Sequence, residues 1–233
     1  MVRHRQIRWV SSQVSRQFLI FLGQKMQFYT NKTKVLFGLC MLCFAVGMPA
    51  AETDEGLYGP AQLIEALQGG GLIIYFRHGA TDHSQDDQHP IDLSDCSTQR
   101  NLSEEGRQQA QRIGEAIKRL NIPIGEVLAS PFCRCRDTAQ LMFGRYRLDD
   151  ALFYAVAVDK ESRVQQSEHL LSLLSTPPPG DANKVIVSHT GNLREATGIW
   201  PKPEGAAWVF RPLGEGGYQA LGLLDPDYWS NVH

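Results

Sequence analysis

The sequence predicts a single α/β domain built as a three-layer α/β/α sandwich with a mostly parallel central sheet. Apolar runs alternate with amphipathic helical patterns over most of the chain. Two of these runs, at residues 72–76 and 185–187, contain no polar residue, which is typical of strands buried on both faces. Strands that alternate with helices in this way favour parallel pairing, because each helix connects two strands across one face of the sheet.

The predicted elements are bounded by recognisable start and stop signals. Three glycines at 69–71 end the first helix, Ser103 is a suitable N-cap for the second, and Pro131 can begin the third. In chain order we expect a helix at 59–68, a strand at 72–76, a helix at 102–120, a strand at 126–130, a helix at 131–142, an extended segment at 152–158, a helix at 161–174, a strand at 184–189 followed by a helix, and a hairpin of strands at 206–212 and 218–224.

Residues 1–51 are expected to be a targeting segment and not part of this domain. They contain seven Lys or Arg and no acid, and an uncharged run from Val35 to Met48 precedes small residues. Fourteen residues are short for a membrane span, which needs about 20, so we expect a signal peptide cleaved near Ala50 or Ala51 and a periplasmic or secreted protein. An uncleaved N-terminal anchor is the alternative, and a start of translation at Met26 remains open.

The remaining residues, 52–233, carry a formal charge of −9, which argues against general binding of nucleic acid. They also hold three cysteines, Cys96, Cys133 and Cys135. In an oxidising compartment an odd number suggests one disulfide and a spare thiol, although three free thiols fit the sequence equally well.

Three predicted strands end in residues that suit phosphate chemistry. Arg77 and His78 follow the first buried strand, residues 130–134 with Arg134 follow the second, and His189 follows the strand at 184–189. Each residue alone has an ordinary structural explanation. Together they point to one pocket, because ligands of parallel sheets bind beyond the carboxyl ends of the strands. A guanidinium group can bind two phosphate oxygens at once through parallel N–H bonds, and it stays charged at any relevant pH. We therefore expect a pocket for a doubly charged oxyanion.

Four ordered motifs carry a resemblance to a known family. "RHGAT" begins at Arg77, "LSEEGRQQA" at Leu102, "SPFCRCRDTA" at Ser130 and "VSHTGN" at Val187. This order resembles the histidine phosphatase superfamily, with its phosphoglycerate-mutase-like fold, and the C-terminal segment is similar to small exported bacterial members. The resemblance implies a phosphatase in which His78 becomes phosphohistidine, Arg77, Arg134 and His189 hold the phosphoryl group, and no metal or cofactor takes part. Gly79 is expected to leave room for substrate and backbone.

The general acid is missing from the two positions where this family carries it. Residues 148–162 contain no glutamate at the expected place, and Thr190 follows the second histidine instead of an acidic residue. Expelling an alkoxide still needs a proton, and we expect Glu204 to supply it, with Asp82 as second choice. Thr81 is expected to donate its hydroxyl to phosphate, although it fits a helix cap as well.

Other readings stay open at this stage. A cluster of His and Asp at residues 78–89 could suggest a metal site, but its spacing matches no zinc pattern, and a solvated acidic loop fits better. The loop at 82–99 is long enough to act as a lid. Besides a phosphomonoester phosphatase, the sequence allows a phosphotransferase or mutase and a non-catalytic module that binds a phosphate ligand. We expect a small phosphorylated substrate of unknown identity, no nucleic acid and no stable membrane insertion after cleavage; the oligomeric state is open.

Overall fold

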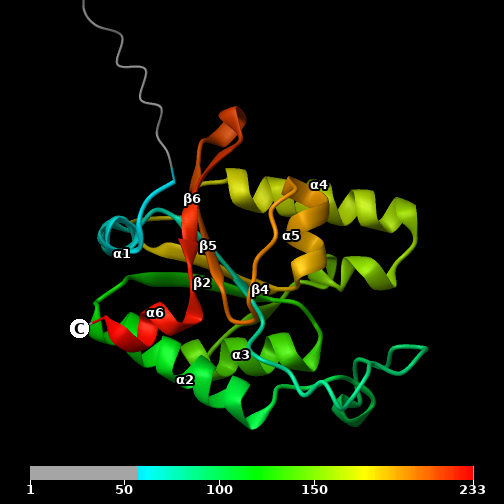
Figure 1. Cartoon of the computed structure of the whole chain (residues 1–233). Helices are drawn as coiled ribbons and strands as arrows, with labels where there is room; N and C mark the ends of the chain where they lie inside the picture. Colours follow the sequence, from blue (N-terminus) through cyan, green and yellow to red (C-terminus); the bar gives the residue numbers. More distant parts are fainter. Residues whose placement is uncertain (1–56, 233) are drawn as a thin grey trace, which may run out of the picture. The chain divides into compact units, whose positions relative to one another are not determined.

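A six-stranded sheet in the order β3-β2-β4-β1-β5-β6 forms the centre of the structure, a computed structural model that describes residues 57–232 (Figure 1). The first four strands in this order are parallel, β5 is antiparallel to β1, and β6 is antiparallel to β5. The strands are β1 (Ile73–Arg77), β2 (Ile124–Ala129), β3 (Arg147–Leu148), β4 (Asn183–Ser188), β5 (Ala207–Pro212) and β6 (Tyr218–Leu224).

Helices cover both faces of this sheet, which confirms the predicted three-layer sandwich. One apolar core joins one face of the sheet to α1, α2, α3 and α6, and a second core joins the other face to α4 and α5. The helices are α1 (Pro60–Gly69), α2 (Glu104–Arg119), α3 (Cys133–Phe143), α4 (Lys160–Ser175), α5 (Thr190–Thr197) and α6 (Pro226–Asn231). Figure 1 shows α2, α3 and α6 below the sheet and α4 and α5 on its other side.

The pairing of β1 with β4 places two histidines side by side at the carboxyl ends of these strands. The two parallel strands are in register with Arg77 opposite Ser188, so both strands end at the same level. The backbone N–H of His78 donates to the carbonyl of Ser188 at 3.0 Å, and His189 follows Ser188 directly. The carboxyl end of β2, which leads to α3, lies on the other side of β4. The topology therefore gathers three strand ends as the sequence predicted.

Close backbone contacts fix the loops around these strand ends. Ser103 caps α2 by accepting from the N–H of Gly106, as predicted. A Cβ atom on Gly106 would lie 1.9 Å from the carbonyl oxygen of Ala80, so the helix can approach the segment after β1 only with glycine there. Gly205 has φ +83° and donates its N–H to the carbonyl of His78 at 2.8 Å. The backbone of His78 is therefore hydrogen-bonded on both sides, through its N–H to β4 and through its carbonyl to the loop before β5.

Two parts of the predicted secondary structure were incomplete or wrong. The segment 152–158 is not extended; short 3₁₀ turns at Asp150–Leu152 and Ala155–Ala157 replace it. Asp149 caps the first turn by accepting from the N–H of Ala151, and the side chain of Leu152 is buried in the core beside α4. The sequence pattern also missed β3 and α6, which are short. Elsewhere the observed boundaries differ from the predicted ones by a few residues.

The predicted targeting segment at 1–51 lies outside the described residues. Within the described part of the chain, no helix is long and apolar enough to cross a membrane.

Candidate active site

His78 lies in a buried position with one ring nitrogen engaged and the other not. Its side chain is 3% exposed, and Nδ1 lies 2.9 Å from the carbonyl oxygen of Gly79. A carbonyl can only accept, so this contact fixes the proton on Nδ1 and leaves the Nε2 lone pair unprotonated. Burial, followed by the positive charge of Arg134, holds the pKa of His78 well below its usual value. The imidazole is therefore neutral at neutral pH, the state that a nucleophile needs.

The His189 ring lies next to the His78 ring, with the ring centroids 5.5 Å apart. Its Nε2 shares a 2.9 Å hydrogen bond with the Ser130 hydroxyl, and its ring packs against Phe132 at 5.0 Å and Tyr154 at 4.9 Å between centroids. Burial and the charge of Arg134 also hold the pKa of His189 well below its usual value. Two neutral imidazoles thus line the pocket.

Arg134 is the most deeply buried charge of the site. Its side chain is 0% exposed, and Nη1 forms an ion pair with Oδ1 of Asp87 at 2.9 Å. The same Nη1 donates to the carbonyl of Arg100 at 3.2 Å. The guanidinium lies over the ring of Phe132, with 4.5 Å from Cζ to the centroid. Nε and Nη2 are buried and find no hydrogen-bond partner among the described residues. Buried donors are normally satisfied, so these two mark a place for an acceptor such as phosphate.

Arg77 and Glu204 form a second ion pair at the rim. Nη2 of Arg77 lies 2.8 Å from Oε1 of Glu204, and Glu204 also accepts from the Thr81 hydroxyl at 3.0 Å and from the Thr81 N–H at 2.8 Å. Nε of Arg77 is buried and has no partner in the described part of the chain. Glu204 therefore reaches the site, as predicted from its position before β5.

Thr81 and Asp82 are placed differently from Glu204. The Thr81 side chain points its hydroxyl at Glu204, and Thr81 does not cap a helix, since it forms an isolated bridge with Leu102. Asp82 turns its carboxylate to Ser84, which donates from its N–H at 2.9 Å and its hydroxyl at 2.7 Å. These two bonds lower the pKa of Asp82. Thr81 as a phosphate ligand and Asp82 as an acid stay predictions, with Glu204 the better placed of the two acids.

Gly79 leaves room for neighbouring backbone, which was one part of the expectation, while its importance for the approach of substrate stays a prediction. A Cβ atom there would lie 3.0 Å from the carbonyl oxygen of Gly106, so the space it leaves is occupied by the first turn of α2. Its N–H donates to the Thr138 hydroxyl of α3 at 3.0 Å.

The site contains residues to which the sequence analysis assigns no part in phosphate chemistry. Asp87 and Arg100 come from the long loop after β1, and Tyr154 comes from the segment between β3 and α4. Asp87 enters the sequence analysis only as a member of the His and Asp cluster at 78–89, for which a solvated acidic loop fits better. The other signal for the loop residues is the unusual length of the loop itself.

A disulfide between Cys96 and Cys133 joins that loop to the first residue of α3. Cys135 is the free thiol, which confirms the predicted arrangement of one disulfide and a spare thiol. Cys135 is buried 3.6 Å from Nε2 of His189, and burial raises the pKa of its thiol to about 12.

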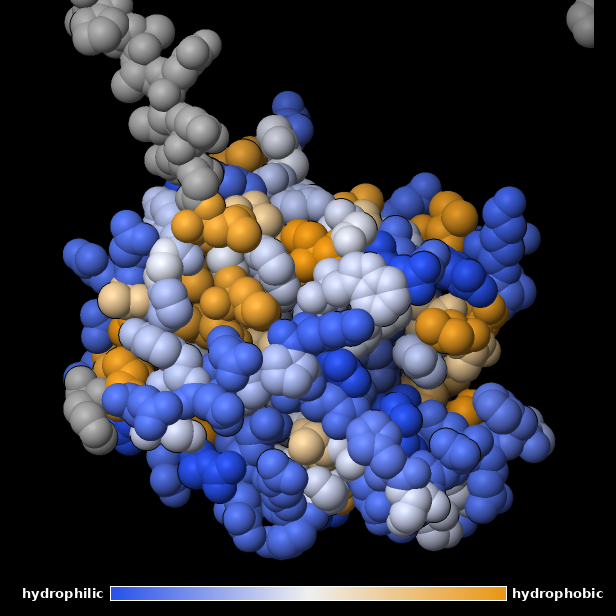
Figure 2. All heavy atoms as spheres, in the orientation of Figure 1, coloured by the Kyte–Doolittle hydropathy of each residue, from blue (hydrophilic) through white to orange (hydrophobic). Residues whose placement is uncertain are grey.

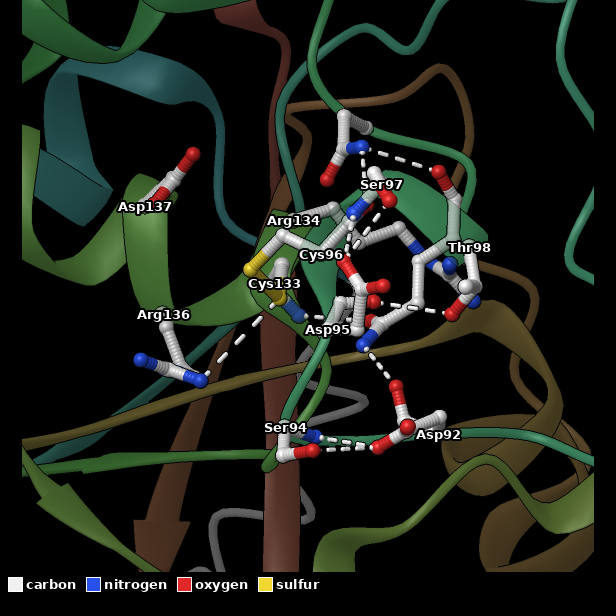
Figure 3. The surroundings of a disulfide bond; sticks show 12 residues. Asp92, Ser94, Asp95, Cys96, Ser97, Thr98, Cys133, Arg134, Arg136 and Asp137 are labelled. Carbon is white, nitrogen blue, oxygen red and sulfur yellow. Dashed lines mark hydrogen bonds between the residues drawn. A yellow bond between two sulfur atoms is a disulfide. The ribbon is translucent and has the colours of Figure 1, made fainter.

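Figure 3 shows that Arg134 directly follows the bridged Cys133. In the loop around Cys96, the Ser94 hydroxyl donates to Asp92 and the Ser97 hydroxyl donates to Asp95. The bridge ties the loop to the helix that carries Arg134.

An open hollow of about 640 Å³ lies next to this site and shares Arg77 and Glu204 with it. Its other charged lining residues, His83, Glu105, Lys202 and Asp227, have mixed sign. On the face drawn in Figure 2, hydrophilic side chains predominate over α2 and the loop after β1, and apolar side chains show in separate small groups. Among residues 57–232, no three His, Cys, Asp or Glu side chains are grouped so that they could hold a metal ion.

Comparison with known proteins agrees with this geometry. The histidine phosphatase superfamily (branch 1) matches residues 73–152, a range that contains Arg77, His78 and Arg134. No curated protein matches the chain. Among solved structures, the chain is similar to the protein histidine phosphatase SixA complexed with tungstate, at 17% identity and a TM-score of 0.48, over 67% of this chain and 98% of that one. It is also similar to a phosphoserine phosphatase from Entamoeba histolytica, at 14% identity and a TM-score of 0.47, over 67% of this chain and 98% of that one.

The family match at residues 73–152 contains the motifs that begin at Arg77, Leu102 and Ser130, whereas the motif with His189 lies beyond it. The match and the motifs support an enzyme of the phosphatase or mutase class. Residues 73–152 of this chain thus match the histidine phosphatase superfamily (branch 1).

Proposed function

We propose that the protein is a phosphomonoester phosphatase that works through a phosphohistidine on His78, without a metal ion. One observation carries the proposal: a neutral imidazole with a free Nε2 lies near the charge of Arg134, and guanidinium N–H groups of Arg134 and Arg77 are buried with no partner among the described residues. Phosphoryl transfer needs an in-line nucleophile and fixed donors around the equatorial oxygens, and little else from the protein.

In this mechanism Nε2 of His78 attacks phosphorus while the ester P–O bond breaks. The leaving oxygen takes a proton from the general acid, for which Glu204 is our candidate. Water then attacks the phosphohistidine and gives a proton to the Glu204 carboxylate while the P–N bond breaks, so that inorganic phosphate leaves and both the imidazole and the acid are restored. Arg77, Arg134 and His189 would hold the three equatorial oxygens through both steps.

The test compares the wild-type protein with His78→Ala and Arg134→Ala on nitrophenyl phosphate. We expect His78→Ala to abolish turnover, and Arg134→Ala to lower kcat by about 100-fold or more with the fold intact, as removal of one transition-state donor does. His169→Ala, on α4 and paired with Asp149, is the control and should keep wild-type activity. After a rapid quench, mass spectrometry should find an acid-labile phosphate on His78; label on a serine would contradict the mechanism.

Two outcomes would favour the alternatives. Transfer of the phosphoryl group to an added alcohol without release of inorganic phosphate would indicate a phosphotransferase or mutase. Binding of phosphate without any turnover would indicate a ligand-binding module. The panel of substrates should include an aryl phosphate, an alkyl phosphate and a phosphoramidate, because they differ in how much help the leaving group needs.

We also propose that the protein is exported and cleaved near Ala50 or Ala51. The basic and apolar leader supports this, and so does the disulfide between Cys96 and Cys133, because disulfides persist mainly in oxidising compartments. N-terminal sequencing of protein from the periplasm or medium should find a start within a few residues of Glu52. A full-length chain recovered from membranes would indicate an anchor instead.

A further inference from the structure

The backbone of Arg100 contacts both partners of the Asp87–Arg134 ion pair. Its N–H donates to Oδ1 of Asp87 at 2.9 Å, and its carbonyl accepts from Nη1 of Arg134 at 3.2 Å. On the C-terminal side, the carbonyl of Asn101 accepts from the N–H of Asp82 at 3.0 Å. The end of the long loop thus lies against the exit of β1 with little freedom to move.

The side chain of Arg100 is only partly exposed and carries an unused donor. Its Nε is fully buried and has no hydrogen-bond partner within residues 57–232. A donor removed from water without a partner costs free energy, so such an atom in a folded protein needs an explanation. An acceptor supplied by a ligand is one.

Charge balance singles out Arg100 among the three arginines. Arg77 is paired with Glu204 and Arg134 with Asp87. Within the described part of the chain, no ion pair joins Arg100 to a carboxylate, whereas the two carboxylates of the site are each paired with another arginine. Each of these two ion pairs carries no net charge. The positive charge of Arg100 is therefore available to an anionic ligand.

The charge of Arg100 also affects the pKa of neighbouring groups of the site. The positive charge of Arg100 is a smaller contribution to the low pKa of His78, after burial, Arg134 and Arg77, and to the low pKa of His189, after burial, Arg134 and His78. It also contributes, after burial, to the lowered pKa of Arg77.

We infer that Arg100 is a third phosphate-binding arginine, which donates to the non-bridging oxygens of the same phosphoryl group that Arg77 and Arg134 hold. This role rests on the proposed function, since it concerns the same pocket. Three guanidinium groups offset by two carboxylates leave one net positive charge to meet a phosphate dianion. The long loop is then a structural part of the phosphate site and not only a cover over it.

Binding of inorganic phosphate and of orthovanadate, measured by isothermal titration calorimetry, tests this inference without any turnover. The variants are Arg100→Ala and Arg100→Lys, in the full-length protein. Arg112→Ala is the matched control, because Arg112 is an exposed arginine on α2 and its removal changes the net charge equally. The contacts of Arg100 with Asp87 and Arg134 come from its backbone, so both substitutions leave them in place; near-ultraviolet circular dichroism and the Tm check the fold.

We expect Arg100→Ala to weaken phosphate binding by about 10- to 100-fold, as for loss of a hydrogen bond to a charged group. The phosphate affinity of Arg100→Lys should lie between those of the wild type and Arg100→Ala, because lysine keeps the positive charge but lacks the planar set of N–H donors. Arg112→Ala should bind as the wild type does. Unchanged affinity in Arg100→Ala would overturn the inference, and so would a wild-type protein that binds neither anion.

A different result would assign Arg100 to another part of the substrate. If Arg100→Ala binds phosphate normally and loses activity only on substrates with a second negative group, the inference is wrong and Arg100 recognises that group. The proposed function fails separately: a wild-type protein that hydrolyses nothing, but whose phosphate binding depends on Arg100, would retain this inference and discard the phosphatase.

Discussion

The carboxylate of Asp87 and the guanidinium of Arg134 form an ion pair across the pocket, with 2.9 Å between Oδ1 and Nη1. Arg134 is fully buried at the start of α3, whereas Asp87 lies in the loop after β1 with a side chain 15% exposed. The same carboxylate oxygen accepts from the backbone of Arg100. A single acidic side chain thus positions one arginine and anchors the segment that carries another.

We therefore expect Asp87→Asn to impair the site and the fold together. Arg134 would lose its counter-charge in a buried position, which should lower the free energy of unfolding by about 1.5–3 kcal/mol. Because the guanidinium would be less firmly oriented, kcat/KM should fall by about 10-fold or more. Asp86→Asn is the control, since Asp86 is its exposed neighbour. Urea unfolding and steady-state kinetics measure both effects; wild-type kinetics in Asp87→Asn would show that Arg134 needs no anchor.

Breaking the disulfide should destabilise the protein and loosen the loop. The bridge between Cys96 and Cys133 closes a segment with a sequence separation of 37, for which the chain-entropy estimate is about 3–4 kcal/mol. The Cys96→Ser and Cys133→Ser double variant should lose free energy of unfolding on this order and bind phosphate more weakly. Dithiothreitol should give the wild-type protein the same properties and leave the double variant unchanged. Equal stability with and without the bridge would contradict the expectation.

The two histidines should remain neutral at a pH below the usual histidine pKa. Burial holds the pKa of His78 and His189 well below their usual value, which is about 6.5 in unfolded chains. Nuclear magnetic resonance titration should find both rings deprotonated at pH 6. Because the charge of Arg134 is the second cause of the shift at His78, Arg134→Gln should move that pKa upward. Protonation of His78 near pH 6.5 would contradict the proposed neutral nucleophile.

The same shifts make stability depend on pH. The unfolded chain binds protons to these histidines below about pH 6.5, while the folded protein does not bind them until a lower pH. Stability is therefore complete above pH 6.5 and decreases as the pH falls towards the folded-state pKa, by at most about 1.4 kcal/mol per histidine for each pH unit. Urea unfolding of the wild-type protein at pH 7 and pH 5.5, compared with His78→Phe, should show a smaller loss in the variant.

Glu204→Gln separates proton donation from the positioning of Arg77. If Glu204 is the general acid, hydrolysis of alkyl phosphates should slow by about 100-fold or more, while nitrophenyl phosphate, with its good leaving group, should change little. Thr81→Val is the companion variant, since it removes one donor to Glu204 and keeps the carboxylate. An equal loss on both substrate classes would assign Glu204 to holding Arg77, with which it forms a 2.8 Å ion pair. Attention would then turn to Asp82 as the acid.

Local patterns in the sequence predicted the sheet and the residues at its edge. Arg77, His78 and His189 could be placed together because each lies within two residues of the end of a continuous apolar run, and parallel strands end on the same side of the sheet. Glu204 was recognised for a similar reason, since it precedes a strand near that edge. Short elements such as β3 and α6 were missed because two to six residues show too little periodicity to identify.

The long loop was decided by tertiary structure alone. The pairing of Cys96 with Cys133, the ion pair of Asp87 with Arg134 and the placement of Arg100 connect residues that are 34 to 47 positions apart. Nothing in the sequence of the loop repeats with a helical or strand period, so its path could not be predicted. Its conformation depends on which buried charges and donors of α3 and β1 it satisfies, and those become neighbours only when the sheet and its helices have assembled.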